Sequence, residues 1–373
     1  MQRHSIEPRA DWRAKVEALG LSFHTTDAPY WDESAYYSFS MAEILEIERS
    51  TGELFGLCCQ AVEHVLKTDR WEEFGIDRSL APAIRRSWVE DDVSLYGRFD
   101  LGLDADGVPK MYEFNADTPT ALLEAAVIQW YWLQERFPDY DQFNSIHERL
   151  VAQWKISELQ GPVHFACCRN SDEEWATTIY MEDTAMQAGF QTHRLFMDEI
   201  GWKADRFVDM QNRPIRTLFK LYPWEWMLRE PFGRHLSREP WQLIEPAWKM
   251  ILSNKRILPL LWELFPGHRN LLPAYTSPEK LGESWIKKPV FGRGGVGITL
   301  RESSPRELAT PGSPEVEGGS IYQALLKPPC IDGRYPVLGS WIVGDTPAGM
   351  GLREANSPIT TEASRFVPHR ITP

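Results

Sequence analysis

Apolar residues recur at helical spacing early in the chain and at strand spacing later. The sequence Ser-Met-Ala-Glu beginning at Ser40 is typical of a capping box, and apolar positions three or four residues apart continue from it to about Leu66. Residues 1–90 are therefore predicted to be mainly helical. In the last third, segments with strand character are predicted at 285–290, 298–300, 320–325, 337–343 and 349–353. The Ser-, Pro-, Gly- and Glu-rich residues 303–319 predict a loop.

The middle of the chain alternates between the two periods. The pattern predicts a strand at 163–167, a helix at 173–188 and a strand at 191–196, followed by a short buried helix at 257–265. This succession indicates an α/β (α+β) fold.

A hairpin is predicted over residues 93–115, with a turn at 104–107. On each strand, apolar and polar side chains alternate, so burial of the apolar face fixes the register. Phe99, Leu101, Leu103, Tyr112 and Phe114 should share the buried face. The opposite face should carry four polar side chains about 5 Å apart across the strands, namely Arg98, Asp100, Glu113 and Asn115.

The polar face of this hairpin is a candidate magnesium site. Asp100, Glu113 and Asn115 supply hard oxygen ligands, and Mg²⁺ prefers one or two carboxylates together with substrate phosphates. The alternative is a solvated polar face that carries an Arg98–Glu113 ion pair.

A helix is predicted from Pro119 to about Phe137, with Thr118 as its N-cap. It is apolar almost all round and should be buried. Its N-terminus would bring free N–H groups and hydroxyls to the end of the hairpin, which suits an anion. A metal site beside an anion site is what phosphoryl transfer to a carboxylate requires.

A glycine-rich loop follows Lys288 and runs to Gly297. It is not a Walker A loop, because its lysine precedes the glycines, and it is not a Rossmann fingerprint, because a strand follows it. We interpret it as a lid over about 280–300 whose backbone N–H groups, including those of Gly294 and Gly295, cover phosphates. A plain glycine hairpin is the alternative.

Composition narrows the possible partners. The chain has 373 residues and a net charge of −13, which argues against binding to nucleic acid or anionic membranes and is compatible with a polyamine substrate. Five cysteines without metal spacing, no signal peptide and no long apolar run predict a cytoplasmic protein with reduced thiols. Its oligomeric state is left open.

The sequence as a whole resembles the glutathionylspermidine synthase family, in its synthetase-only form without an amidase domain. The collinear matches are Gly97-Arg-Phe-Asp100, Tyr112-Glu-Phe-Asn-Ala-Asp117, Met181, Gln187-Ala-Gly-Phe190, Glu245-Pro-Ala-Trp248, Asn254-Lys-Arg-Ile-Leu-Pro259, Leu264-Phe-Pro266, Lys288-Pro289, Gly292-Arg293, Ile321-Tyr-Gln323, Asp332-Gly333 and Leu352-Arg353. The resemblance implies an ATP-grasp fold, with an N-terminal pre-ATP-grasp region at 1–90 and a synthetase core at 91–373.

The resemblance also implies a reaction. An ATP- and Mg²⁺-dependent ligase would phosphorylate the carboxylate of a glutathione-like acid, and an amine such as spermidine or another polyamine would attack the acyl phosphate. By position, Asp100, Glu113 and Asn115 would hold Mg²⁺. ATP would contact Arg98, Lys255, Lys288, Gln323, Gly294 and Gly295, with Arg98 and Arg353 steadying the transferred phosphoryl group. The acid would contact Thr118, Thr120, Glu173 or Glu174, and Arg293.

Two departures from the family pattern bear on the substrate. Leu221 replaces a threonine, and residues 359–362 replace a lysine-rich stretch. They keep a second hypothesis open, a nucleotide-binding protein of this fold with a regulatory or assembly role and no ligase activity. A third is a kinase that stops at the phosphorylated acid.

Overall fold

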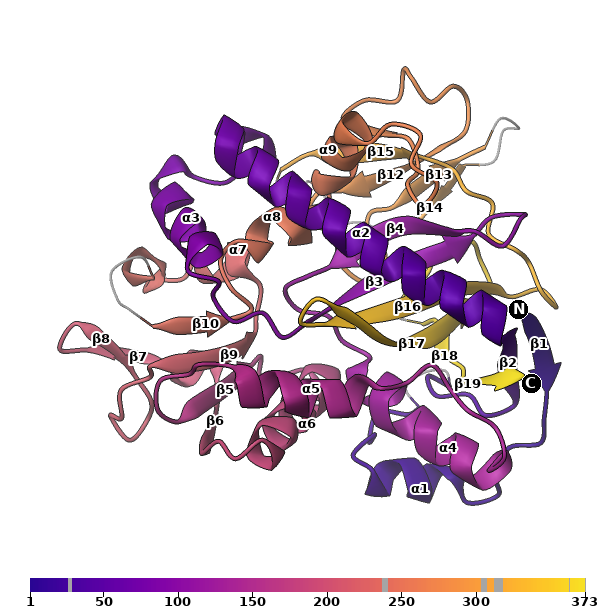
Figure 1. Cartoon of the computed structure of the whole chain (residues 1–373), viewed down its shortest axis with the longest axis horizontal. Coiled ribbons are helices and arrows are strands. Elements are labelled where there is room, and N and C mark those ends of the chain that lie inside the picture. Colours follow the sequence, from indigo (N-terminus) through magenta and orange to yellow (C-terminus); the bar gives the residue numbers. More distant parts are fainter. Residues whose placement is uncertain (26–28, 237–240, 303–306, 312–317, 362, 373) are drawn as a thin grey trace.

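A five-stranded antiparallel sheet forms the centre of the molecule (Figure 1). The computed structural model describes all residues except 26–28, 237–240, 303–306, 312–317, 362 and 373. In sheet order the central strands are β18 (Arg365–Phe366), β17 (Thr346–Ala355), β16 (Tyr335–Val343), β3 (Tyr96–Leu103) and β4 (Pro109–Asn115). The predicted hairpin is therefore a pair of neighbouring strands in this sheet, and the strands predicted at 337–343 and 349–353 are confirmed.

The long helix α2 (Met41–Thr68) crosses one face of the central sheet (Figure 1). The hydroxyl of Ser40 accepts the Glu43 backbone N–H, and the Glu43 carboxylate accepts the Ser40 N–H, so the predicted capping box is present. The apolar stripe of α2 joins the same buried cluster as Phe99 and Leu101 of β3. The cleft described below lies on the polar side of the hairpin.

Residues 1–90 contain strands as well as helices. In addition to α1 (Trp12–Ala18) and α3 (Ala81–Val89), this region supplies β1 (Gln2–Ser5) and β2 (Ala35–Ser40), which form a three-stranded sheet with β19 (His369–Thr372). Five of the six β2 residues are buried, so the strand lacks the alternation by which a sequence pattern reveals a strand. Both chain ends thus lie in one sheet.

A second five-stranded antiparallel sheet packs on the helix α9 (Ile257–Leu264), which follows α8 (Lys249–Ser253). Its order is β11 (Ala274–Tyr275), β15 (Ser320–Ala324), β12 (Trp285–Pro289), β13 (Thr299–Arg301) and β14 (Glu307–Ala309). The predicted strands in this part are confirmed. The predicted loop at 303–319 is interrupted by β14, and 303–306 and 312–317 lie outside the described residues.

The alternating middle of the chain contains the predicted strands and helix, and its strands form a parallel sheet. Its order is β10 (Gln242–Ile244), β9 (Thr217–Leu221), β5 (Val163–Cys167) and β6 (Thr192–Phe196). The accompanying elements are α5 (Ile146–Ile156), α6 (Asp172–Gln187), α7 (Trp224–Met227) and the hairpin β7 (Gly201–Lys203) with β8 (Arg206–Val208). The 3₁₀ turns are Trp71–Phe74, Arg78–Leu80, Met197–Glu199 and Gly233–His235.

The helix that follows the hairpin begins later than predicted. Helical structure starts at Leu122, because Ala121 adopts a left-handed φ of 62°, and Thr118 is therefore not its N-cap. A π-helical turn spans Glu124–Ile128 before α4 (Gln129–Arg136). The inner face is buried as expected, but the side chains of Trp130 and Tyr131 are exposed to solvent.

Candidate active site

One cleft of about 1140 Å³ collects every site residue that the sequence singled out. The hairpin β3–β4, the strands β12, β15 and β17, the glycine loop and the start of α6 line it. The predicted residues present in its lining are Arg98, Asp100, Glu113, Asn115, Thr118, Thr120, Glu173, Glu174, Lys255, Lys288, Arg293, Gly294, Gly295, Gln323 and Arg353. Segments more than 250 residues apart in the chain thus meet at one place.

The hairpin register brings the acidic side chains together. Asp100 lies opposite Glu113, and Arg98 lies opposite Asn115. Neighbouring positions on adjacent strands hold such side chains about 5 Å apart. The predicted polar face is therefore formed, with all four side chains in one patch.

A β-bulge changes the buried face. Leu101 pairs with Met111, so Tyr112 falls out of the ladder and turns to the polar side. There its ring lies over Gly102, where a β carbon would stand 2.2 Å from the Tyr112 hydroxyl. The prediction that Tyr112 shares the buried face of Phe114 was wrong, because alternation cannot anticipate an extra residue in one strand.

The donor set fits Mg²⁺. Asp100 accepts hydrogen bonds from Arg98 at 2.7 and 3.1 Å, and its Oδ2 lies 3.5 Å from Arg353. The alternative Arg98–Glu113 ion pair is not the one formed, since Glu113 pairs with Lys255 at 3.1 Å. No group of three or more His, Cys, Asp and Glu side chains gathers as a metal site in the described part of the chain. A metal here would take two carboxylates, the Asn115 amide oxygen and nucleotide phosphate oxygens.

Two lysines approach the hairpin from the opposite side of the cleft, Lys288 from β12 and Lys255 from the connection between α8 and α9. The ammonium of Lys288 donates to the Tyr112 carbonyl and to Gln323 Oε1, each at 2.8 Å, and burial lowers its pKa to about 8. Burial opposes ionisation of Glu113, but the positive charges of Lys255 and Lys288 outweigh it and hold the pKa of Glu113 well below its ordinary value. The cleft therefore holds a charged carboxylate between two cations.

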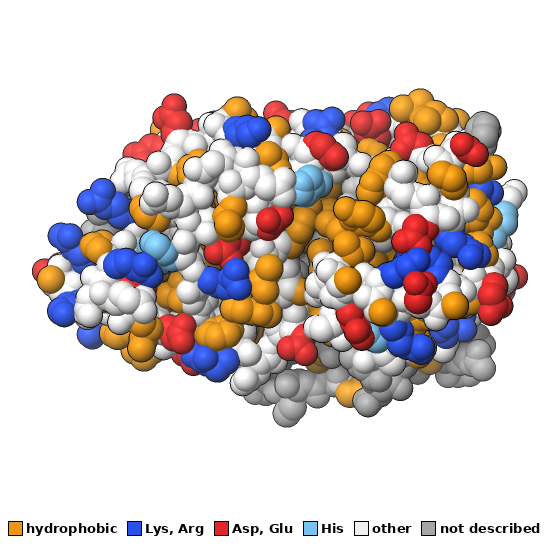
Figure 2. Space-filling model, turned by 90° about the horizontal axis from the view of Figure 1, so that it is seen from below, with side chains coloured by type: hydrophobic (Ala, Val, Ile, Leu, Met, Phe, Trp, Pro, Cys, Tyr) orange, Lys and Arg blue, Asp and Glu red, His pale blue; other side chains and the backbone are white. Residues whose placement is uncertain are grey.

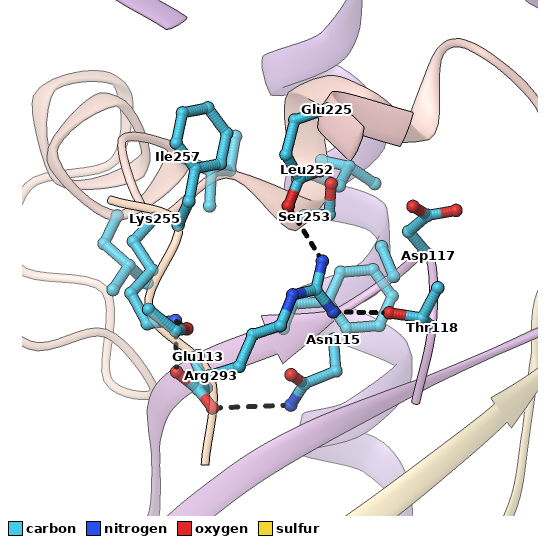
Figure 3. A pocket seen from close by; sticks show the side chains of 15 residues that line it. Glu113, Asn115, Asp117, Thr118, Glu225, Leu252, Ser253, Lys255, Ile257 and Arg293 are labelled. Carbon is cyan, nitrogen blue, oxygen red and sulfur yellow. Dashed lines mark hydrogen bonds and ion pairs between the residues drawn. The ribbon is translucent and has the colours of Figure 1, made fainter. Parts of the chain in front are cut away.

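From the glycine loop, the side chain of Arg293 reaches toward Thr118 and Glu225 (Figure 3). Arg293 donates to Thr118 Oγ1 at 2.6 Å and pairs with Glu225 of α7 at 2.9 Å. Farther along the loop, Gly295 has a φ of 75°, and a β carbon there would stand 2.2 Å from the Thr360 carbonyl oxygen. The loop thus contacts the segment that follows the hairpin, the helix α7 and the C-terminal segment, as a lid would.

The start of α6 brings carboxylates to the other end of the cleft. Ser171 caps the helix by accepting the Glu174 N–H, and Glu173 and Glu174 both line the cavity. Burial raises the pKa of Glu174, whose carboxylate accepts the backbone N–H of Cys168 at 3.3 Å. This end is suited to attract an ammonium group.

Of the two departures from the family pattern, Leu221 lies in the core and the stretch that begins at Ile359 lies at the cleft. Leu221 is 1% exposed in the core around Phe165, so the lost hydroxyl does not belong to the cleft. Ile359, Thr360 and Thr361 do line the cleft, whereas residue 362 lies outside the described residues.

Sequence reasoning missed two buried polar pairs at this site. Lys220 donates to Asp117 at 2.5 Å with both side chains buried, and Asp117 also accepts the Trp224 N–H. The hydroxyl of Tyr30 donates to Glu124 at 2.6 Å. Asp117 and Lys220 stand in the family motifs, but Tyr30 has no local pattern to reveal it.

The fold and the cleft together define an ATP-grasp protein, the fold class predicted from the sequence. A glutathione synthetase-like effector of Globodera pallida has the same fold, with a TM-score of 0.62 and 9% identity over 97% of this chain and 95% of its own. The family model described as "Glutathionylspermidine synthase preATP-grasp" matches residues 3–372. The chain belongs to the glutathionylspermidine synthase family, as the resemblance implied.

Curated relatives support the class of enzyme. A Haemophilus influenzae protein named as an acid–amine ligase is 41% identical over 92% of this chain and 91% of its own length. The bifunctional glutathionylspermidine synthetase/amidase of Escherichia coli is 29% identical over 96% of this chain. Trypanothione synthetase of Crithidia fasciculata is 28% identical over 84%. The chain spans 63% and 53% of the last two proteins. These relatives confirm the prediction of an acid–amine ligase.

The surface and the helices bear on possible partners. On the face shown in Figure 2, acidic and basic side chains are interspersed, with no block of a single sign. Among the helices that the structure describes, none is long and apolar enough to span a membrane. The cysteines of the described chain are free thiols, of which Cys58 and Cys167 are buried.

Proposed function

We propose that this protein joins the carboxylate of a glutathione-like acid to a polyamine or another primary amine, using ATP and Mg²⁺. The observation that carries the proposal is the meeting of Asp100, Glu113, Asn115, Lys255 and Lys288 in one cleft beneath a glycine lid. Phosphoryl transfer depends mainly on positioning and on stabilising charge, and these groups supply both.

Each side of the cleft has a role in the proposed reaction. Asp100, Glu113 and Asn115 hold Mg²⁺, which neutralises phosphate charge. Lys255 and Lys288 contact the phosphates, Gln323 lies at the nucleotide, and the lid amides of Gly294 and Gly295 cover it. Because Arg98 and Arg353 both reach Asp100, they are placed to steady the phosphoryl group as it moves to the acid.

The substrates are assigned by charge. Thr118, Thr120 and Arg293 offer hydroxyls and a cation to the acid, while Glu173 and Glu174 offer negative charge to the amine or to an amino group of the acid. In this structure Arg293 is bound to Glu225 and Thr118. It has to leave these two partners when the acid binds.

Mass spectrometry of reaction mixtures tests this proposal. The wild-type protein is incubated with ATP, Mg²⁺, glutathione and a panel of polyamines and amino acids. An amide product is expected, and Asp100→Ala should abolish it by removing a metal ligand. Asp106→Ala, in the exposed turn of the same hairpin, is the matched control and should retain activity. Full activity of Asp100→Ala would show the metal assignment to be wrong.

A further inference from the structure

Glu124 is a buried carboxyl group beside the cleft that the proposed reaction has not yet used. Its side chain is 1% exposed, and it accepts a hydrogen bond from the Tyr30 hydroxyl at 2.6 Å. Buried carboxylates are ordinarily paired with a cation or with several donors, because desolvation of an unpaired charge is costly. A neutral hydroxyl is a weak substitute for a cation.

The backbone around Glu124 is also unusual. The π-helical turn starts at this residue, three residues after the left-handed Ala121. π turns are rare inside helices and are frequent at functional sites. Here the turn brings Glu124 into hydrogen-bond contact with Tyr30, and Tyr30 lines the cleft.

The surroundings connect this pair to the proposed reaction centre. The charged side chains that act on both Tyr30 and Glu124 are Glu173 of α6 and Arg353 of β17. Arg353 in turn lies 3.5 Å from Asp100, a proposed metal ligand. Tyr30, Glu173 and Arg353 all line the same cleft, so the Tyr30–Glu124 pair adjoins the space in which the amine and the phosphoryl group would meet.

We infer that Tyr30 and Glu124 form a proton relay that deprotonates the attacking amine, with Tyr30 contacting the amine and Glu124 acting through it. This inference rests on the proposed function. Burial, reinforced by the charge of Glu173, raises the pKa of Glu124 to about 7, which is near the operating pH that suits a proton acceptor. Burial likewise raises the pKa of Tyr30, so its hydroxyl is protonated at rest.

The proposed step balances as follows. The substrate ammonium gives one proton to the Tyr30 oxygen, while the Tyr30 hydroxyl proton moves to the Glu124 carboxylate. The freed lone pair of the nitrogen forms the C–N bond, the bond between the acyl carbon and the phosphate oxygen breaks, and phosphate leaves with its electron pair. The nitrogen then loses its second proton to that phosphate.

A comparison of two nucleophiles tests the relay. Spermidine enters as a cation and needs a proton acceptor, whereas hydroxylamine is largely neutral at pH 7 and does not. With ATP, Mg²⁺ and glutathione, Glu124→Gln and Tyr30→Phe should lower kcat/KM for spermidine by about 10²–10⁴-fold, the usual range for general base catalysis. Formation of the glutathione hydroxamate should stay at the wild-type rate. Tyr131→Phe, at an exposed tyrosine of α4, is the matched control.

The pH profile gives a readout that a purely structural role would not move. For the wild-type protein, kcat/KM for spermidine should rise through about pH 7 with ionisation of Glu124, and this step should be absent in Glu124→Gln. Equal losses with both nucleophiles, or an unchanged profile, would overturn the relay. If Glu124→Gln does not fold, Tyr30→Phe alone decides the comparison. Absence of hydroxamate in the wild-type reaction would instead contradict the proposed function.

Discussion

Replacing Glu124 by glutamine should make the stability of the protein less dependent on pH. The substitution keeps an oxygen that can accept the Tyr30 hydroxyl bond but removes the ionisation. In the wild-type protein the native state holds the Glu124 proton up to about pH 7, whereas the unfolded chain releases it near pH 4.5. Stability from this group is therefore present below pH 4.5 and is lost as the pH rises to about 7.

The size of this effect follows from the two pKa values. A rise from 4.5 to about 7, at about 1.4 kcal/mol for each tenfold change in proton affinity, corresponds to about 3 kcal/mol. The Glu124 side chain is fully buried, so solvent screening does not reduce this figure appreciably. The free energy of unfolding of Glu124→Gln, relative to wild type, should thus increase by about 3 kcal/mol between pH 4 and pH 8.5. The burial cost of the new amide shifts both ends equally and cancels.

Urea denaturation followed by tryptophan fluorescence at a series of pH values measures this difference; the chain has sixteen tryptophans. Glu135→Gln, on the following helix, is a control for which the pH dependence should have the opposite sign. Hydrogen bonds and ion pairs with Lys15 and Arg9 overcome the effect of burial and lower the pKa of Glu135. That variant should lose relative stability as the pH rises through the acidic range to about 4.5, the ordinary pKa of this group, and should change little above it. A Glu124→Gln difference that stays constant with pH would refute the reasoning, since the carboxyl group would then be ionised with an adequate partner.

Two further substitutions test the architecture of the cleft. Lys220→Met should destabilise the fold by about 3–5 kcal/mol, because it leaves Asp117 buried without its cation; thermal unfolding checks this, and adding Asp117→Asn should recover part of the loss. Gly295→Ala should raise the KM for ATP, because the new methyl group forces the lid away from Thr360. Gly267, outside the lid, has a similar positive φ with no heavy atom within 4 Å of its added β carbon, so Gly267→Ala should leave that KM unchanged.

Local patterns predicted the elements that this sequence marks clearly. The capping box at Ser40, the strand β3 and the buried strand β5 were each predicted from neighbouring residues, and each was found close to where it was expected. The family motifs likewise identified the residues that line the cleft, although their individual roles stay predictions.

The features that were missed depend on contacts distant in sequence or on irregular backbone. The bulge at Tyr112 and the left-handed Ala121 each alter a regular pattern by one residue, and no periodicity contains that information. Tyr30 reaches Glu124 across 94 residues, so the pair exists only in the folded chain.

The central claim, ligation through an acyl phosphate, is tested most directly by oxygen transfer. Glutathione labelled with ¹⁸O in its carboxylates is incubated with the protein, ATP, Mg²⁺ and spermidine, and the released phosphate is analysed by mass spectrometry. The account predicts one ¹⁸O atom in each phosphate, because the carboxylate oxygen that attacks ATP leaves with the phosphoryl group when the amide forms. Amide product accompanied by unlabelled phosphate would contradict the acyl-phosphate route.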